Sequence, residues 1–136
     1  MQEDFVSLDF KDSGDDPLQH ALKQTKRAPD QERERRLYCV ACKHPITSNG
    51  ERIEVQGAHE HTCTNPHDIT FHIGCFRQAP GCVSVGAATQ EHTWFAGYAW
   101  QLALCNGCGN HLGWLFQRQG ASGFYGLIIA QLAGEH

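Results

Sequence analysis

Two C-x2-C units constrain the fold of this chain more than any other feature of its sequence. The units are Cys39-Val-Ala-Cys42 and Cys105-Asn-Gly-Cys108, and residues 43–104 separate them. Each unit directs two thiolates at one point, so the pair supplies the four ligands of a tetrahedral zinc site. Because the separation is long, the metal would join the start of a domain to its late strands. Four thiolates leave no open coordination position, which predicts a structural zinc ion rather than a catalytic one.

The composition is that of one globular domain. The chain has 136 residues, of which 40% are hydrophobic and 19% charged. Its seven cysteines are an odd number, and the N-terminus lacks the basic and apolar regions of a secretory signal, so we expect a reducing compartment, the cytoplasm. Cys63, Cys75 and Cys82 lack a partner spacing and are predicted to be buried thiols. The net charge of −4 and the lack of a long apolar run favour neither nucleic acid nor a membrane as partner.

Charge separates the first part of the chain from the rest. Residues 1–16 carry six acidic side chains against one lysine, whereas residues 17–36 carry six basic side chains against three acidic ones. We expect residues 1–36 to be a mobile charged segment, with a short helix before Pro29, and residues 37–136 to form the ligand-binding domain. The mixture of charges favours a solvated linker over a tract that binds polyanions.

From residue 37 onward the sequence is typical of an antiparallel, mostly β domain. Apolar and polar residues alternate over residues 52–55, 69–73 and 98–104, turn residues are frequent, and residues 112–116 are a further strand candidate. Residues 125–132 fit either a strand or a short helix. The string His59-Glu-His-Thr-Cys63 offers metal-binding side chains, but we expect a loop there without a convergent fourth ligand.

All three tryptophans lie close together around the second C-x2-C unit. Trp94 precedes an Ala-Gly turn, Trp100 follows it, and Trp114 lies beyond the cysteines. Core packing is the usual role of aromatic residues in a small β domain, and a binding pocket is the alternative. Such a pocket suits two kinds of ligand. One is a quaternary ammonium or methyl-lysine group beside the Glu91 carboxylate, and the other is a flat neutral ring whose polar edge bonds to the backbone.

The joint pattern resembles the thalidomide-binding domain of the cereblon family. The resemblance is carried by the run Glu91-His-Thr-Trp-Phe-Ala-Gly-Tyr-Ala-Trp100, followed by Cys-x2-Cys-x2-His-Leu-Gly-Trp-x-Phe116. Upstream, Asn65-Pro-His67 and the first C-x2-C unit match in kind and order, so the resemblance covers roughly residues 37–132. In length the chain is similar to single-domain bacterial cereblon-like proteins, for which a ubiquitin-ligase role is not implied.

This resemblance implies a β-tent, in which two antiparallel sheets meet at an angle and are pinned by the zinc ion. It implies that Trp94, Trp100 and Trp114 form a cage around a glutarimide or similar cyclic imide, with Phe116 at its base. The imide N–H would donate to the backbone carbonyl of His92, and an imide carbonyl would accept from the backbone N–H of Trp94. The implied ligand-binding residues are Asn65, Pro66, Phe71, Glu91, His92, Thr93, Trp94, Trp100, Trp114 and Phe116.

One position departs from the family pattern. Ala96 stands where the family usually has proline. Because proline fixes φ, alanine is expected to leave the loop of the cage more mobile when no ligand is bound.

The predicted function is the non-catalytic binding of cyclic imides. These ligands include thalidomide-type drugs, uracil-like rings and proteins bearing a C-terminal cyclic imide formed from Asn or Gln. The first alternative is a thiol reductase, because zinc-bearing methionine sulfoxide reductases share the β-tent. Its nucleophile would have to be Cys63, Cys75 or Cys82. The second alternative is a methyl-lysine reader that uses Glu91.

Overall fold

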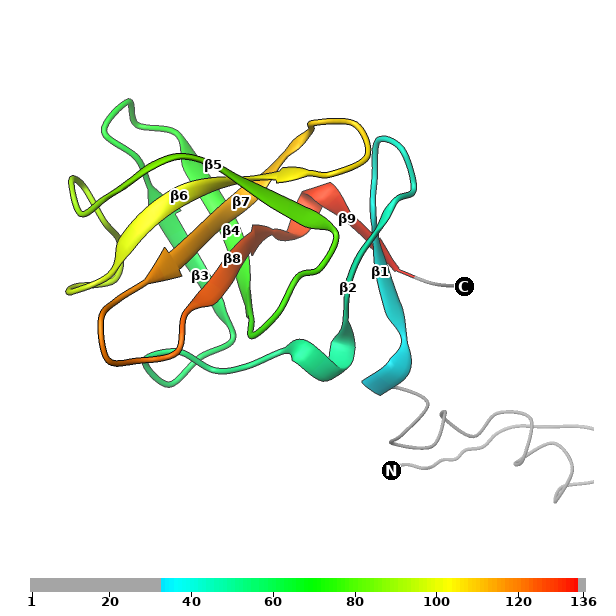
Figure 1. The fold of residues 1–136 in the computed structure, drawn as a ribbon, viewed down its shortest axis with the longest axis horizontal. Coiled ribbons are helices and arrows are strands. Elements are labelled where there is room, and N and C mark those ends of the chain that lie inside the picture. Colours follow the sequence, from blue (N-terminus) through cyan, green and yellow to red (C-terminus); the bar gives the residue numbers. More distant parts are fainter. Residues whose placement is uncertain (1–32, 135–136) are drawn as a thin grey trace, which may run out of the picture. The chain divides into compact units, whose positions relative to one another are not determined.

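The computed structural model describes residues 33–134, and β-strands predominate in this part of the chain (Figure 1). The elements in this range are β1 (Arg36–Cys39), β2 (Pro45–Ser48), the 3-10 helix η1 (Asn49–Glu51), β3 (Glu60–Thr64), β4 (Thr70–Phe76), β5 (Cys82–Thr89), β6 (Ala99–Cys105), β7 (His111–Gln117), β8 (Phe124–Ile128), the 3-10 helix η2 (Ile129–Gln131) and β9 (Leu132–Gly134). The strands form a three-stranded sheet of order β2-β1-β9 and a six-stranded sheet of order β3-β4-β8-β7-β6-β5. Every pairing is antiparallel, which confirms the predicted mostly β fold of two antiparallel sheets.

Two of the sequence predictions concern residues that precede the described range. The acidic residues 1–16 and the short helix expected before Pro29 lie outside the described residues. Within residues 33–134, no helix has the length and the apolar character needed to cross a membrane.

Two local predictions were wrong. Residues 52–55 form only isolated bridges, from Arg52 to Phe76 and from Val55 to Ala58. The chain reverses immediately after Val55, since Gln56 and Gly57 both have positive φ angles (54° and 88°), and the segment therefore has no length over which to pair. Conversely, the predicted loop around residues 59–63 is strand β3, whose side chains alternate between exposed and half-buried.

The C-terminal segment combines both structures that its sequence allowed. β8 pairs with β4 and β7 in the large sheet, and η2 then redirects the chain into β9, which pairs with β1 in the small sheet. The same stretch therefore joins the two sheets covalently.

Two buried clusters divide the interior. The first lies where the sheets meet and contains Cys39, Ile46, Phe76, Ala79, Cys105, Leu112 and Leu127. The second contains Ile73, Cys75, Phe95, Trp114, Phe116 and Phe124. In this second cluster the ring of Phe95 lies edge-on to those of Phe116 and Phe124, at centroid distances of 4.8 Å and 5.1 Å. Phe95 thereby anchors the loop that carries Trp94 to the large sheet.

Candidate functional site

The four predicted cysteine ligands converge at the junction of the two sheets. Cys39 ends β1 in the small sheet, and Cys105 ends β6 in the large one. All four sulfur atoms lie within 4.8 Å of one another, with Cys39 Sγ 3.8 Å from Cys108 Sγ and Cys42 Sγ 3.6 Å from Cys105 Sγ. A tetrahedral site with metal–sulfur bonds of about 2.3 Å has sulfur–sulfur edges of about 3.8 Å. The cluster is therefore spaced to bind a metal ion.

The two cysteine turns have the same backbone design. Lys43 N–H donates to Cys39 O and Gly109 N–H donates to Cys105 O, both at 2.8 Å. Lys43 and Gly109 also share a positive φ angle (68° and 79°). In the first turn, burial raises the pKa of the Cys39 thiol, but the N–H groups of Cys42 and Ala41 lower it to about 7. These N–H groups thus stabilise the thiolate of Cys39, the form that a metal ligand requires.

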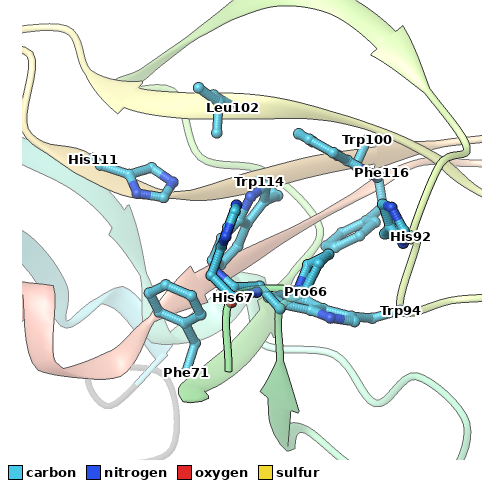
Figure 2. A pocket seen from close by; sticks show the side chains of 11 residues that line it. Pro66, His67, Phe71, His92, Trp94, Trp100, Leu102, His111, Trp114 and Phe116 are labelled. Atoms are coloured by element: carbon cyan, nitrogen blue, oxygen red, sulfur yellow. The ribbon is translucent and has the colours of Figure 1, made fainter. Parts of the chain in front are cut away.

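A pocket of about 470 Å³ opens on the large sheet. Its lining residues are Asn65, Pro66, His67, Phe71, His92, Trp94, Trp100, Leu102, His111, Trp114 and Phe116. They come from the loop before β4, the loop before β6, and strands β4, β6 and β7 (Figure 2). Eight of the ten residues that the resemblance implied are brought together here, and Glu91 and Thr93 are the two that do not line the pocket.

Glu91 and Thr93 shape the loop instead. The Glu91 carbonyl accepts the indole N–H of Trp100 at 2.8 Å, whereas its carboxylate is exposed and lies 3.9 Å from His92 Nε2. The Thr93 hydroxyl donates to Phe95 O and accepts from Phe95 N–H. Both residues therefore contribute by positioning neighbouring aromatic side chains.

The aromatic walls contact one another directly. The Trp94 and Trp114 rings lie edge to face at a centroid distance of 4.7 Å, and Phe71 lies 5.0 Å from Trp114 in a similar arrangement. The indole N–H of Trp94 donates to Thr64 O at 3.0 Å, which ties the cage loop to β3. Two of the three indoles are thus held through their N–H groups.

Three polar groups of the residues that line the pocket are unpaired within the described part of the chain. Within residues 33–134, neither the carbonyl of His92, nor the backbone N–H of Trp94, nor the indole N–H of Trp114 has a hydrogen-bond partner. Trp114 is only 8% exposed, so water has little access to its side chain. His92 adopts a positive φ of 60°, which is uncommon for a residue other than glycine. Unpaired groups of this kind in a pocket are typical of a ligand site.

Asn65 holds the loop at the pocket mouth. Its Oδ1 accepts from the N–H groups of His67 and Ile69, both at 2.9 Å, and its carbonyl accepts from Asp68 N–H at 3.0 Å. Asp68 has a positive φ of 64°. The side chain that lines the pocket therefore also fixes the turn that presents Pro66 and His67.

Leu102 and His111 line the pocket but were not among the predicted ligand-binding residues. Leu102 was accessible to prediction, because it lies two residues after Trp100 on an alternating strand. His111 was not, because alternation from Trp114 places it on the opposite face. A bulge reverses this expectation: Ala103 pairs with Gly113 but Leu104 pairs with His111, which leaves Leu112 without a partner in that register.

The remaining cysteines lie outside the pocket. Cys75 is buried, and Cys63 and Cys82 are half-buried. Burial raises the pKa of Cys75 and of Cys82 to about 12, and it also raises the pKa of Cys63. These thiols are therefore protonated and weakly nucleophilic at neutral pH.

The histidines of β3 and β4 serve structural contacts. His61 Nε2 lies 2.9 Å from Val55 O and 3.0 Å from Ala58 O, so this ring closes the turn between them. On the exposed face, His72 lies between Glu60 (2.8 Å) and Thr62 (2.9 Å). Across the described part of the chain, the four cysteines are the group of His, Cys, Asp and Glu residues that converges as a metal site does.

Part of this chain is similar in sequence to cereblon proteins. A stretch of 52 residues, 38% of the chain, is 42% identical to protein cereblon of Gallus gallus, 38% to that of Xenopus tropicalis and 36% to that of Danio rerio. The stretch spans 12% of the length of each of these relatives. No protein-family model matches the chain. The curated matches support a cereblon-like domain here.

Proposed function

Starting from a cereblon-like domain, we propose that this protein binds cyclic imides in the pocket bounded by Trp94, Trp100 and Trp114, without catalysing a reaction on them. The ligand class comprises glutarimides, including thalidomide-type drugs, together with uracil-like rings. It also includes polypeptides whose C-terminal Asn or Gln has cyclised. The family resemblance suggests this class, and the unpaired polar groups of the pocket support it independently.

The observation that carries the proposal is the match between these groups and the edge of an imide. An imide presents a carbonyl oxygen, an N–H and a second carbonyl oxygen in a row. The pocket residues offer two unpaired donors, Trp94 N–H and the indole N–H of Trp114, and one unpaired acceptor, the His92 carbonyl. Each protein group that is buried on binding would then gain a partner, which avoids the penalty of an unsatisfied polar group.

The aromatic walls suit a small neutral ring. A glutarimide has eight heavy atoms, so micromolar binding, about −8 kcal/mol, requires about −1 kcal/mol for each atom. That value approaches the ceiling for very small ligands and demands nearly complete enclosure. The edge-to-face contact of Trp94 with Trp114 and the buried ring of Phe116 supply apolar surfaces of this kind. A neutral imide also needs no buried counter-charge.

We assign the four-cysteine cluster to a structural zinc ion. The donor set is all sulfur and tetrahedrally spaced, which suits Zn²⁺. Cys39, Cys42, Cys105 and Cys108 would hold it, and the metal would stabilise the junction of the two sheets. With four protein ligands it would have no position left for a substrate.

Two observations favour binding over the alternative functions. A reductase needs a thiolate near its substrate, whereas Cys63, Cys75 and Cys82 are outside the pocket lining and have raised pKa values. The methyl-lysine reader that the sequence suggested would combine cation–π attraction with a nearby carboxylate. The Glu91 carboxylate, which was the candidate for that group, is exposed and does not line the pocket.

The direct test is a titration of the zinc-loaded protein with unsubstituted glutarimide, followed by intrinsic tryptophan fluorescence. We expect a saturable change in the micromolar range that is lost in Trp100→Ala. The matched control is Val83→Ala on β5, an exposed residue outside the pocket, which should bind as the wild type does. The proposal is wrong if glutarimide gives no saturable change, or if Trp100→Ala binds it with undiminished affinity.

A further inference from the structure

The four residues of the cysteine cluster differ in their access to water. Cys39 and Cys105 are buried, with exposed fractions of 0% and 1%, whereas Cys42 and Cys108 are exposed. Four thiolates around a divalent cation leave negative charge in excess. Water can donate hydrogen bonds to the two exposed thiolates, but the two buried ones need donors from the protein, because a buried charge without a partner is costly.

Both buried sulfur atoms have an N–H donor in the structure. The Gly107 N–H donates to Cys105 Sγ at 3.3 Å, from within the same turn. The side-chain amide of Asn110 donates to Cys39 Sγ at 3.8 Å, although 71 residues separate the two in the sequence. A thiolate can only accept, so the nitrogen of this amide, and not its oxygen, faces the sulfur. This donor adds to the backbone N–H groups of the first turn that stabilise the same thiolate.

Asn110 also links the elements that surround the cluster. Its side-chain amide donates to Gln131 Oε1 at 2.7 Å, and its backbone carbonyl accepts from Cys105 N–H at 2.8 Å. Gln131 ends η2, and its own carbonyl accepts from Val40 N–H at 3.0 Å. In Figure 1 the turn after β1 and the turn after β6 lie side by side. Asn110 and Gln131 therefore connect both cysteine turns with the element that redirects the chain from the large sheet to the small one.

We propose that Asn110 is a positioning residue of the metal centre. Its amide stabilises the metal-bound thiolate of Cys39 and, through Gln131, holds η2 against the two cysteine turns. This inference rests on the assignment of a metal ion to the four-cysteine cluster, and it adds a residue that lies outside both C-x2-C units. Without the amide, Cys39 Sγ and Gln131 Oε1 would each lose a donor. Removing an outer-shell partner of a metal ligand typically lowers metal affinity by about 10- to 100-fold.

The first test measures the zinc affinity of Asn110→Leu by competition with a chromogenic chelator. Leucine has the branched shape of asparagine but no N–H, so the affinity should fall by about 10- to 100-fold. The matched control is Asn106→Leu, in the exposed second turn, because the Asn106 side chain has no hydrogen-bond partner among residues 33–134. This control should bind zinc as the wild type does. An undiminished affinity in Asn110→Leu, or an equal loss in both variants, would contradict the inference.

A second measurement uses the wild-type protein and does not depend on a variant that folds. Cadmium replaces zinc in thiolate sites, and a hydrogen bond to a metal-bound sulfur transmits scalar coupling from ¹¹³Cd to the proton of the donor. We expect coupling to one side-chain N–H proton of Asn110, with the Gly107 N–H as the internal reference. The inference is overturned if Gly107 shows the coupling and Asn110 does not. A wild-type protein that binds neither zinc nor cadmium would overturn the metal assignment and this inference with it, whatever its affinity for glutarimide.

Discussion

The loop that carries Trp94 contains a turn into which a proline can be placed, and this yields a quantitative prediction. Tyr98 N–H donates to Phe95 O at 2.9 Å, and Gly97 has a φ of 86°. These are the features of a type II turn in which Ala96 occupies the second position, where proline is favoured. Ala96 is exposed, and within the described range its N–H has no hydrogen-bond partner. Substitution by proline would therefore remove no hydrogen bond.

The expected effect of Ala96→Pro is a gain of about 0.4–1 kcal/mol in the free energy of unfolding, because proline reduces the conformational freedom of the unfolded chain. For a domain of this size the gain corresponds to an increase in Tm of about 2–8 °C. If the loop also becomes ordered when an imide binds, the same restriction strengthens binding by at most about two- to fivefold.

The assay is thermal unfolding at saturating zinc, with a glutarimide titration on the same samples. Ala96→Gly is the matched control, because it gives the loop more freedom and should lower the stability by about 0.5–1 kcal/mol. A Tm for Ala96→Pro below that of the wild type would show that residue 96 does not adopt the φ of about −65° that proline requires. The turn assignment would then be refuted, whatever the affinity for the imide.

Three further predictions concern the metal, the base of the cage and pH. We expect elemental analysis to find one zinc ion per chain in the wild type and none in Cys108→Ser. Cys82→Ser should retain the zinc, since Cys82 lies opposite Cys105 but outside the cluster. Gly126→Ala should lower the free energy of unfolding, measured by chemical denaturation, by about 1–3 kcal/mol and weaken glutarimide binding, because its Cβ would lie 2.9 Å from the buried ring of Phe116. In the control Gly134→Ala the added Cβ meets no atom within 4 Å, so both properties should be unchanged. Burial lowers the pKa of His111 in the folded state, so the unfolded chain takes up its proton first as the pH falls below about 6.5, and stability decreases with acid. Between pH 7 and pH 5 the Tm of His111→Phe should therefore fall by less than that of the wild type.

The sequence predicted the elements whose signals are local. Alternation located β4 and β6, and the paired C-x2-C units located the four cysteines that converge. It failed at residues 52–55, where a real alternation is cut short by the positive φ angles of Gln56 and Gly57. It also failed at β3, where histidine, cysteine and threonine give no apolar period. In both cases the deciding factor was the presence or absence of a partner strand, which local alternation does not encode.

Within the pocket, too, contacts between residues that are distant in the sequence were not predicted. The positions of the three tryptophans were accessible from the family resemblance, whereas the different roles of their N–H groups were not. Trp94 and Trp100 donate to Thr64 O and Glu91 O, atoms that lie 30 and 9 residues earlier in the chain. The family resemblance likewise implied Glu91 as a ligand-binding residue, although in the structure its carbonyl accepts the indole N–H of Trp100 and its carboxylate is exposed and does not line the pocket.

The four-cysteine cluster and the pocket lie at two ends of one hairpin, which would give a bound metal a role beyond joining the sheets. The turn Cys105–Cys108 connects β6, which carries Trp100, to β7, which carries Trp114. The bulge lies beside this turn, where Leu104 pairs with His111, and beyond it Leu102 pairs with Trp114 and Trp100 with Phe116. A slip of one residue in this register would move every pocket side chain of β7 to the other face of the sheet. By fixing both cysteines of the turn, a bound metal would oppose such a slip. The zinc ion would therefore keep Trp100 opposite Phe116 and His111 beside Trp114 without touching a ligand.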